Sequence, residues 1–131
     1  MHLTLEAKKG APPFFLGAKR DDIKQLLLPA IATTHLMEPE NDFYEGEGLI
    51  LGYDSNENLE YIEILKPNLV EFESLKLFSL SAERIISALK ELGHEAPYND
   101  GGYIFKSIGI ALYCPMEKIE SVSIFQDGYY D

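Results

Sequence analysis

The second half of this chain resembles its first half, and this internal similarity constrains the fold more than any other feature. A shift of the numbering by 60 brings like residues together: Ile50–Tyr53 falls on Ile110–Tyr113, Phe43 on Tyr103, and Ile62 and Ile64 on Val122 and Ile124. Each copy would supply one helix followed by an antiparallel meander of two or three strands. We therefore expect a single α+β domain, residues 1–131, with related units at about 18–77 and 80–131. Two similar helix–hairpin segments of independent origin would give the same pattern.

Hydrophobic periodicity and turn residues place the individual elements. Helices are predicted at Lys19–Leu28, which Pro29 ends, and from the N-cap Ser81 to about Leu92, which Gly93 ends. The acidic segment Glu38–Gly48 reads as a loop or an irregular edge. Strands are predicted at Leu3–Glu6, Leu49–Tyr53, Leu59–Leu65, Leu69–Leu77, Tyr103–Phe105, Ile108–Tyr113 and Ser121–Phe125. Because short turns make neighbouring strands antiparallel, we expect a curved antiparallel sheet, or two meanders side by side, with both helices on one face.

Alternation along the strands assigns residues to the two faces of this sheet. Ile62, Ile64 and their counterparts Val122 and Ile124 should face the core. Tyr61 and Glu63 then lie on the opposite face, where the second copy carries only Ser121 and Ser123. A tyrosine beside a glutamate at that face indicates contact with a partner, unless a loop of the same chain covers it.

Length and composition limit the class of protein. A chain of 131 residues can bury a core without disulfides, and its one cysteine, Cys114, excludes an internal disulfide and is typical of a reducing compartment. The N-terminus lacks the basic start and apolar stretch of a signal peptide, and no apolar run is long enough to span a bilayer. We therefore expect a cytoplasmic protein.

The net charge of −11 is unevenly distributed along the chain. No Lys or Arg occurs between Lys24 and Lys66, an interval that contains nine carboxylates: Glu38, Glu40, Asp42, Glu45, Glu47, Asp54, Glu57, Glu60 and Glu63. Such a charge disfavours binding to nucleic acid or to an anionic membrane, because both require a basic surface. A basic protein is the natural complement. The alternative is a solvated face that only promotes solubility.

No catalytic motif stands out in the sequence. There is no Gly-x-Gly-x-x-Gly, no P-loop, no His-Glu-x-x-His and no Gly-x-Ser-x-Gly, and the three histidines stand far apart. We therefore expect no enzyme, no cofactor and no metal site. The alternative is a small cytoplasmic enzyme whose carboxylates act on a cationic or sugar-like substrate. A third option is an adaptor that pairs with itself through an open sheet edge.

Four segments of the chain resemble a known group of proteins: Gly48–Asp54, Leu59–Ile64, Leu77–Glu83 and Gly128–Asp131. They look like the small bacterial immunity proteins of polymorphic toxins and of contact-dependent growth inhibition. The similarity covers roughly residues 40–131. It implies a cytoplasmic antidote, without catalytic residues, that binds one cognate toxin domain, often a nuclease, and blocks it.

The combined interpretation is an acidic surface that occludes a basic toxin domain, from a protein that is a monomer or a weak dimer. The predicted contact residues are five carboxylates and three aromatic anchors: Glu45, Glu47, Asp54, Glu57 and Glu63, with Tyr44, Tyr53 and Tyr61. A second docking mode is addition of a toxin strand to a sheet edge, either at Leu69–Phe72 or at the strand ending in Tyr129. The sequence does not choose between the two modes.

Overall fold

The central hairpin forms where apolar and polar residues alternate most regularly. In the computed structural model, which describes residues 1–35 and 38–130, strands β6 (Leu49–Tyr53) and β7 (Leu59–Leu65) have the predicted bounds. The Asp54 carboxylate accepts hydrogen bonds from the backbone N–H groups of Asn56 and Asn58, each at 2.9 Å, and so closes the turn between these strands. Asp131, the last residue of the resemblance, lies outside the described residues.

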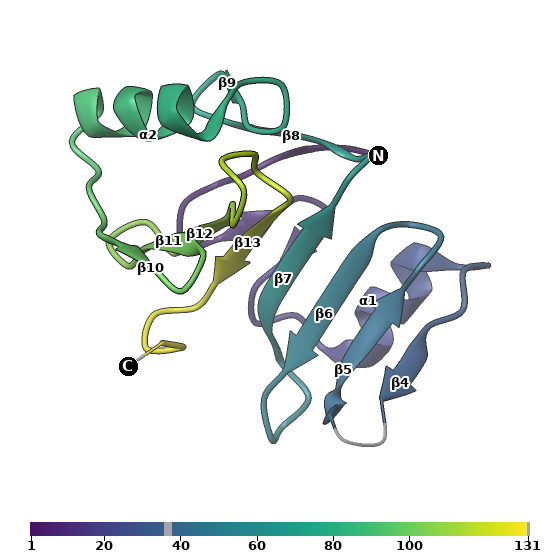
Figure 1. The fold of residues 1–131 in the computed structure, drawn as a ribbon. Coiled ribbons are helices and arrows are strands. Elements are labelled where there is room, and N and C mark those ends of the chain that lie inside the picture. Colours follow the sequence, from purple (N-terminus) through teal and green to yellow (C-terminus); the bar gives the residue numbers. More distant parts are fainter. Residues whose placement is uncertain (36–37, 131) are drawn as a thin grey trace.

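One large antiparallel sheet dominates the structure (Figure 1). Over the described residues it has eight strands in the order β10-β11-β12-β13-β7-β6-β5-β4. The remaining six of these strands are β4 (Thr33–His35), β5 (Glu38–Tyr44), β10 (Tyr98–Asn99), β11 (Gly102–Phe105), β12 (Ile110–Tyr113) and β13 (Ser121–Phe125). The expectation of an α+β fold with a large antiparallel sheet is therefore confirmed.

Shorter strands complete the fold. A small sheet has the order β1-β8-β9, in which β1 is parallel to β8, and β2 and β3 form a separate pair. These strands are β1 (His2–Thr4), β2 (Gly10–Ala11), β3 (Phe14–Phe15), β8 (Leu69–Phe72) and β9 (Leu75–Lys76). The single strand predicted at Leu69–Leu77 is therefore wrong, because Glu73 and Ser74 both have positive φ and turn the chain into a hairpin.

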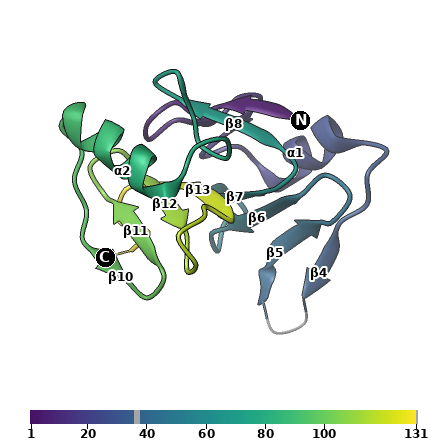
Figure 2. The same ribbon diagram turned by 45° about the horizontal axis from the view of Figure 1, so that its top comes forward.

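Two helices pack into the core beside different halves of the sheet. Helix α1 (Arg20–Leu27) lies beside the β4–β6 half and α2 (Ala82–Glu91) beside the β10–β12 half (Figures 1 and 2). Ser81 caps α2 as predicted, since its side chain accepts a hydrogen bond from the Arg84 N–H at 3.3 Å. Both helices bury their apolar residues in one core together with the inward face of the sheet. No helix in the described part of the chain is both long and apolar enough to cross a membrane.

The predicted core positions of the two central strands are confirmed. Ile62, Ile64, Val122 and Ile124 are all fully buried. They lie side by side because β7 and β13 pair antiparallel, with Ile62 opposite Ile124 and Ile64 opposite Val122. Burial of one such side chain contributes about 1.5–3 kcal/mol to the free energy of folding. These four residues therefore pack β7 and β13 together at the centre of the sheet.

The expectation of a loop or irregular edge over Glu38–Gly48 is wrong for its first seven residues, which form β5. The apolar alternation was hidden because Asp42 occupies an inward position and is fully buried. There it is paired with Arg20 of α1, whose Nη2 lies 2.6 Å from Oδ1 and whose Nε lies 3.0 Å from Oδ2. A buried carboxylate is tolerated only with such a partner. The strand thus depends on a residue 22 positions earlier in the chain.

The ungapped shift by 60 fails in one strand of the proposed repeat. Ile50 pairs with Glu63 on the outward face, whereas Ile110 pairs with Ile124 on the core face. The inward counterpart of Ile110 is therefore Leu49, one residue earlier. The first hairpin contains one more residue than the second, and its strand pairing shifts between Gly52 and Tyr53.

Candidate functional site

The sheet face opposite the helices carries the candidate site, and we call it the open face. The strand pairing puts one set of side chains there because residues opposite each other share a face. Glu63 lies opposite Ser123, Ser123 lies on the same face as its partner Ala111, and Tyr113 lies opposite Ser121. Tyr61 and Glu63 are thus on the outward face, as the alternation predicted.

A hollow forms on the open face because several of its residues are small. Gly102, Ala111, Ser121 and Ser123 lie on adjacent strands β11, β12 and β13, and larger residues surround them. Gly102 is required here, since a Cβ atom at this position would lie 2.4 Å from the Leu112 carbonyl oxygen. The result is a pocket of about 270 Å³.

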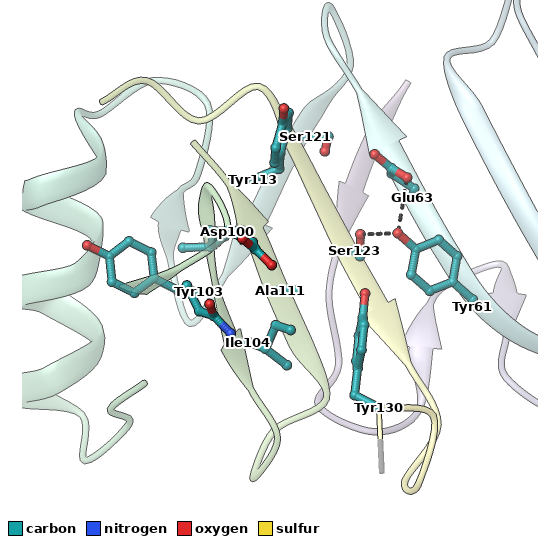
Figure 3. A pocket seen from close by; sticks show the side chains of 13 residues that line it. Tyr61, Glu63, Asp100, Tyr103, Ile104, Ala111, Tyr113, Ser121, Ser123 and Tyr130 are labelled. Carbon is teal, nitrogen blue, oxygen red and sulfur yellow. Dashed lines mark hydrogen bonds between the residues drawn. The ribbon is translucent and has the colours of Figure 1, made fainter. Parts of the chain in front are cut away.

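Polar and aromatic side chains form the walls of this pocket (Figure 3). Glu63 and Tyr61 stand on the β7 side, and Asp100, in the turn between β10 and β11, stands on the opposite side. The complete lining is Tyr61, Glu63, Asn99, Asp100, Gly102, Tyr103, Ile104, Ala111, Leu112, Tyr113, Ser121, Ser123 and Tyr130. Two carboxylates and the rings of Tyr61, Tyr113 and Tyr130 therefore surround a floor of small residues, whereas the Tyr103 ring points away from it and packs against the core.

Tyr61 links the two central strands on the open face. Its hydroxyl donates to Glu63 Oε1 at 3.0 Å and lies 2.8 Å from Ser123 Oγ. Because the single hydroxyl proton of Tyr61 goes to the carboxylate, Ser123 is the donor in the second bond. Burial raises the pKa of Tyr61 well above its ordinary value, and the charge of Glu63 raises it further. Tyr61 is therefore a neutral donor that fixes the position of the Glu63 carboxylate.

The C-terminal segment of the chain covers Tyr61. Tyr129 stacks on it with ring centroids 4.9 Å apart, and Tyr130 meets Phe125 edge-on at 4.8 Å. The segment is anchored by the Gln126 N–H, which donates to the Glu60 carbonyl oxygen at 3.0 Å. Burial, with smaller contributions from Tyr130 and nearby carboxylates, raises the pKa of Tyr129 to about 12. A segment of the same chain thus occupies part of the surface where a partner was expected.

Two of the predicted aromatic anchors do not reach the surface. Tyr44 and Tyr53 are each 1% exposed, and both belong to the core. The Arg20 guanidinium carbon lies 4.8 Å from the centre of the Tyr53 ring, so this tyrosine packs beneath the buried ion pair. The expectation that Tyr44 and Tyr53 act as surface anchors is therefore wrong.

Four of the five predicted acidic contacts lie at opposite ends of strand β6, and the fifth, Glu63, lies within β7 and lines the pocket. Glu45 and Glu47 are in the turn between β5 and β6, whereas Asp54 and Glu57 are in the turn between β6 and β7. Strand β6 separates these turns by five residues, or about 16 Å. Glu57 also stabilises the fold, because its Oε1 lies 3.6 Å from Arg20 Nη1 and its carbonyl accepts the Arg20 N–H at 3.0 Å.

The predicted contact set omits Glu38, Glu40 and Glu60. Glu40 and Asp54 act electrostatically on Glu60, and Glu38 and Glu40 act with Glu60 on Tyr129. We call Glu38, Glu40, Asp54 and Glu60 the acidic end. Burial raises the pKa of Glu60, and the charges of Asp54 and Glu40 raise it further, while Glu60, Glu40 and Glu38 all act on the pKa of Tyr129. The sequence marks these residues by the absence of Lys and Arg between Lys24 and Lys66. It does not predict their positions, because Glu38–Gly48 is expected to be a loop or an irregular edge.

Few of these carboxylates are neutralised by the chain itself. Of the nine between residues 38 and 63, two have a basic nitrogen within 4.0 Å in the residues that the structure describes. They are Asp42 and Glu57, and both pair with Arg20. The acidic end and the pair Glu45 and Glu47 therefore present charge to the surroundings.

Neither predicted site of strand addition has a free edge. Strand β8 (Leu69–Phe72) lies between β1 and β9, and β13, the strand that precedes Tyr129, lies between β12 and β7. Both strands already have a neighbour on each side, so neither can accept another. These two predictions are wrong. In the described part of the large sheet, the outermost strands are the short β4 and β10.

No group of three or more His, Cys, Asp or Glu residues positioned to hold a metal ion occurs among residues 1–35 and 38–130. Comparison with protein-family models, with curated proteins and with solved structures finds no match.

Proposed function

We propose that this chain is an immunity protein that binds a cognate bacterial toxin domain, a basic nuclease, and neutralises it by occlusion. One observation supports this most: β5, β6 and β7 gather carboxylates on one half of the sheet, and most of them lack a basic partner within the described residues. Basic residues of the same chain neutralise little of this negative charge. It is complementary to a basic protein, and opposed fields accelerate encounter and select the partner.

The proposed mechanism follows from what a nuclease site must bind. Such a site is basic because it holds phosphate groups. Carboxylates that stand where phosphate oxygens would lie can accept the same charge-assisted hydrogen bonds. The toxin then loses access to its substrate, and the immunity protein needs no catalytic residue. Its place of action is the cytoplasm, where such a nuclease would meet its target.

The dimensions of the surface decide how much of it one partner can cover. A standard interface buries about 800 Å² on each side, which corresponds to a disc about 32 Å across. The two groups of carboxylates are about 16 Å apart. One partner can therefore contact the acidic end, the turn with Glu45 and Glu47, and Glu63 between them.

Charge reversal at each end tests this proposal and locates the contact. The partner is first captured from native cells and identified, and its dissociation constant is then measured for the double variants Glu38→Lys/Glu40→Lys and Glu45→Lys/Glu47→Lys. At least one of them should bind more than about tenfold more weakly, because attraction becomes repulsion. The control Glu91→Lys/Glu95→Lys, on and just after α2, changes net charge by the same amount at exposed positions. Equal affinity for all three variants would refute the acidic-surface mechanism.

We further propose that the two meanders are related units that meet at the β7–β13 pair. The support is that Glu63 and Ser123, equivalent under the shift by 60, lie opposite each other. Sequences of relatives should show the same match once one residue is skipped in the first hairpin. Relatives in which the two halves share no pattern would contradict a common origin.

The pocket on the open face favours the alternative function, a small enzyme whose carboxylates act on a cationic or sugar-like substrate. Glu63 and Asp100 would be its reactive groups, since they face each other across the pocket. Turnover of such a substrate that disappears in both Glu63→Gln and Asp100→Asn would support the enzyme and displace the immunity proposal.

A further inference from the structure

We infer that the pocket on the open face binds a guanidinium group, and that its source is an arginine side chain of the protein partner. The inference about the pocket depends on its own residues. The assignment of the source to a partner rests on the function proposed above, so the two are tested separately.

An unsatisfied hydroxyl marks the pocket as a binding site. Ser121 is 3% exposed, it lines the pocket, and its Oγ has no hydrogen-bond partner among residues 1–35 and 38–130. A buried hydroxyl without a partner costs about 1–3 kcal/mol. A ligand N–H that reaches this oxygen would supply the missing bond. Of the floor residues, Ser121 would therefore gain the most stabilisation from a bound donor, because its Oγ is unsatisfied.

The charge of the lining selects a cation. Glu63 and Asp100 stand on opposite sides, and no Lys, Arg or His is among the described residues that line the pocket. Glu63 accepts one hydrogen bond from Tyr61, but a carboxylate offers about four acceptor positions. The carboxylate is therefore held in place by Tyr61 and still has capacity for a ligand. An anion or a phosphate would meet two negative groups and no compensating charge.

The aromatic walls favour a planar, weakly hydrated cation over a compact one. Tyr113 and Tyr130 stand at the rim near Ser121 and Ser123, respectively (Figure 3). A guanidinium stacks on aromatic rings and directs several N–H donors in its plane, whereas an ammonium is strongly hydrated and has a point charge. The volume of about 270 Å³ is at the small end for ligand sites. It suits one side chain better than a nucleotide or an oligosaccharide.

The test uses small probes and backbone NMR of the intact chain. L-Argininamide should cause saturable shifts at the amides of Gly102, Ser121 and Glu63 at millimolar concentration. L-Citrullinamide has the same shape without the charge and should bind at least about tenfold more weakly, since charge-assisted hydrogen bonds are the stronger ones. L-Lysinamide should also bind more weakly. Equal shifts with the citrulline probe, or shifts confined to other surfaces, would overturn the inference.

Variants separate the pocket from the rest of the acidic surface. Glu63→Gln keeps a side chain that can accept from Tyr61 but removes the charge, and it should weaken argininamide binding by about fivefold or more. Ser121→Ala should also weaken binding, yet it should fold normally because it removes an unsatisfied group. The matched control Glu91→Gln, an exposed carboxylate on α2, should bind like the wild type. Full affinity in both pocket variants would refute a role for these groups.

A blocked tripeptide, acetyl-Gly-Arg-Gly-amide, distinguishes the two sources of a guanidinium. If an arginine of a folded partner is the occupant, the peptide should bind at least as well as argininamide, because flanking backbone must be accommodated. Exclusion of the peptide while argininamide binds would assign the pocket to a free small molecule and overturn the partner assignment. Charge reversal at the acidic end tests the proposed function independently, since Glu38 and Glu40 do not line this pocket.

Discussion

Replacing Arg20 by methionine should destabilise the protein more than any surface substitution. Methionine keeps the length and the apolar stem of the side chain but removes the guanidinium that pairs with the buried Asp42 carboxylate. Arg20 makes two hydrogen bonds to this carboxylate, at 2.6 and 3.0 Å, and a third to the Pro39 carbonyl oxygen at 3.1 Å. The Asp42 side chain is completely buried and the Arg20 side chain is 11% exposed.

The geometry sets the expected magnitude. Removal of one partner from a buried ion pair costs about 3–5 kcal/mol, because the buried charge that remains loses its opposite charge. The slight exposure of Arg20 admits some solvent screening, so we expect about 3 kcal/mol. That is a large fraction of the 5–15 kcal/mol that usually stabilises a domain.

The free energy of unfolding is measured by urea unfolding, followed by circular dichroism and by tyrosine fluorescence. Tyrosine fluorescence is the suitable probe because the chain has no tryptophan. The double variant Arg20→Met/Asp42→Leu should recover much of the loss, because no charge is then buried. The control Arg84→Met, at an exposed position of α2, should change stability by less than about 0.5 kcal/mol. A loss below about 1 kcal/mol for Arg20→Met, or a double variant less stable than the single one, would refute this reasoning.

Three further predictions concern the open face and the core. Tyr61→Phe removes the bonds to Glu63 and Ser123 and should cost about 1–2 kcal/mol in urea unfolding, whereas no loss would mean that these bonds are not formed. The pKa of Tyr129 is raised to about 12 from its ordinary value of 10. Its contribution to stability is therefore complete below pH 10 and is lost as the pH rises through 12. Tyr129→Phe should flatten that part of the pH profile of stability, and an unchanged profile would contradict this prediction. Burial raises the pKa of the Cys114 thiol, so a thiol reagent should label it only at the rate of unfolding, and rapid labelling of the native protein would show that it is accessible.

Local patterns in the sequence predict those parts of the fold that local forces determine. The hairpin of β6 and β7 has its predicted bounds, because apolar alternation and a turn stabilised by Asp54 act within a few residues. Helix α2 begins after the predicted cap Ser81 for the same reason. The inward positions Ile62 and Val122 follow from alternation alone.

Parts of the fold that depend on distant residues could not be predicted. The sequence does not predict β5 because one of its two buried positions carries Asp42, whose burial is supported by the distant Arg20. Tyrosine suits both the surface and the core, so the sequence does not determine where Tyr44 and Tyr53 lie; in the structure both are buried, and Arg20 of α1 lies over the Tyr53 ring. Short turns do not determine the order of strands, so the sequence predicts an edge at β8, whereas the structure places β8 between β1 and β9.

The pocket had a partial signal in the sequence. Strand β13 carries the small residues Ser121 and Ser123 on the face where β7 carries Tyr61 and Glu63, and this contrast of size produces the hollow. Asp100 joins the site only through the β10–β11 turn, and Tyr130 only through the path of the C-terminal segment. Neither contribution follows from a local pattern.

Growth of cells that express the captured partner is the measurement that tests the central proposal most directly. The partner should be basic, should stop growth when expressed alone, and should be harmless when this chain is expressed with it. Protection should fail when Glu38→Lys/Glu40→Lys and Glu45→Lys/Glu47→Lys are combined in a chain that circular dichroism shows to be folded. A partner that does not impair growth, or full protection by the combined variant, would contradict the account.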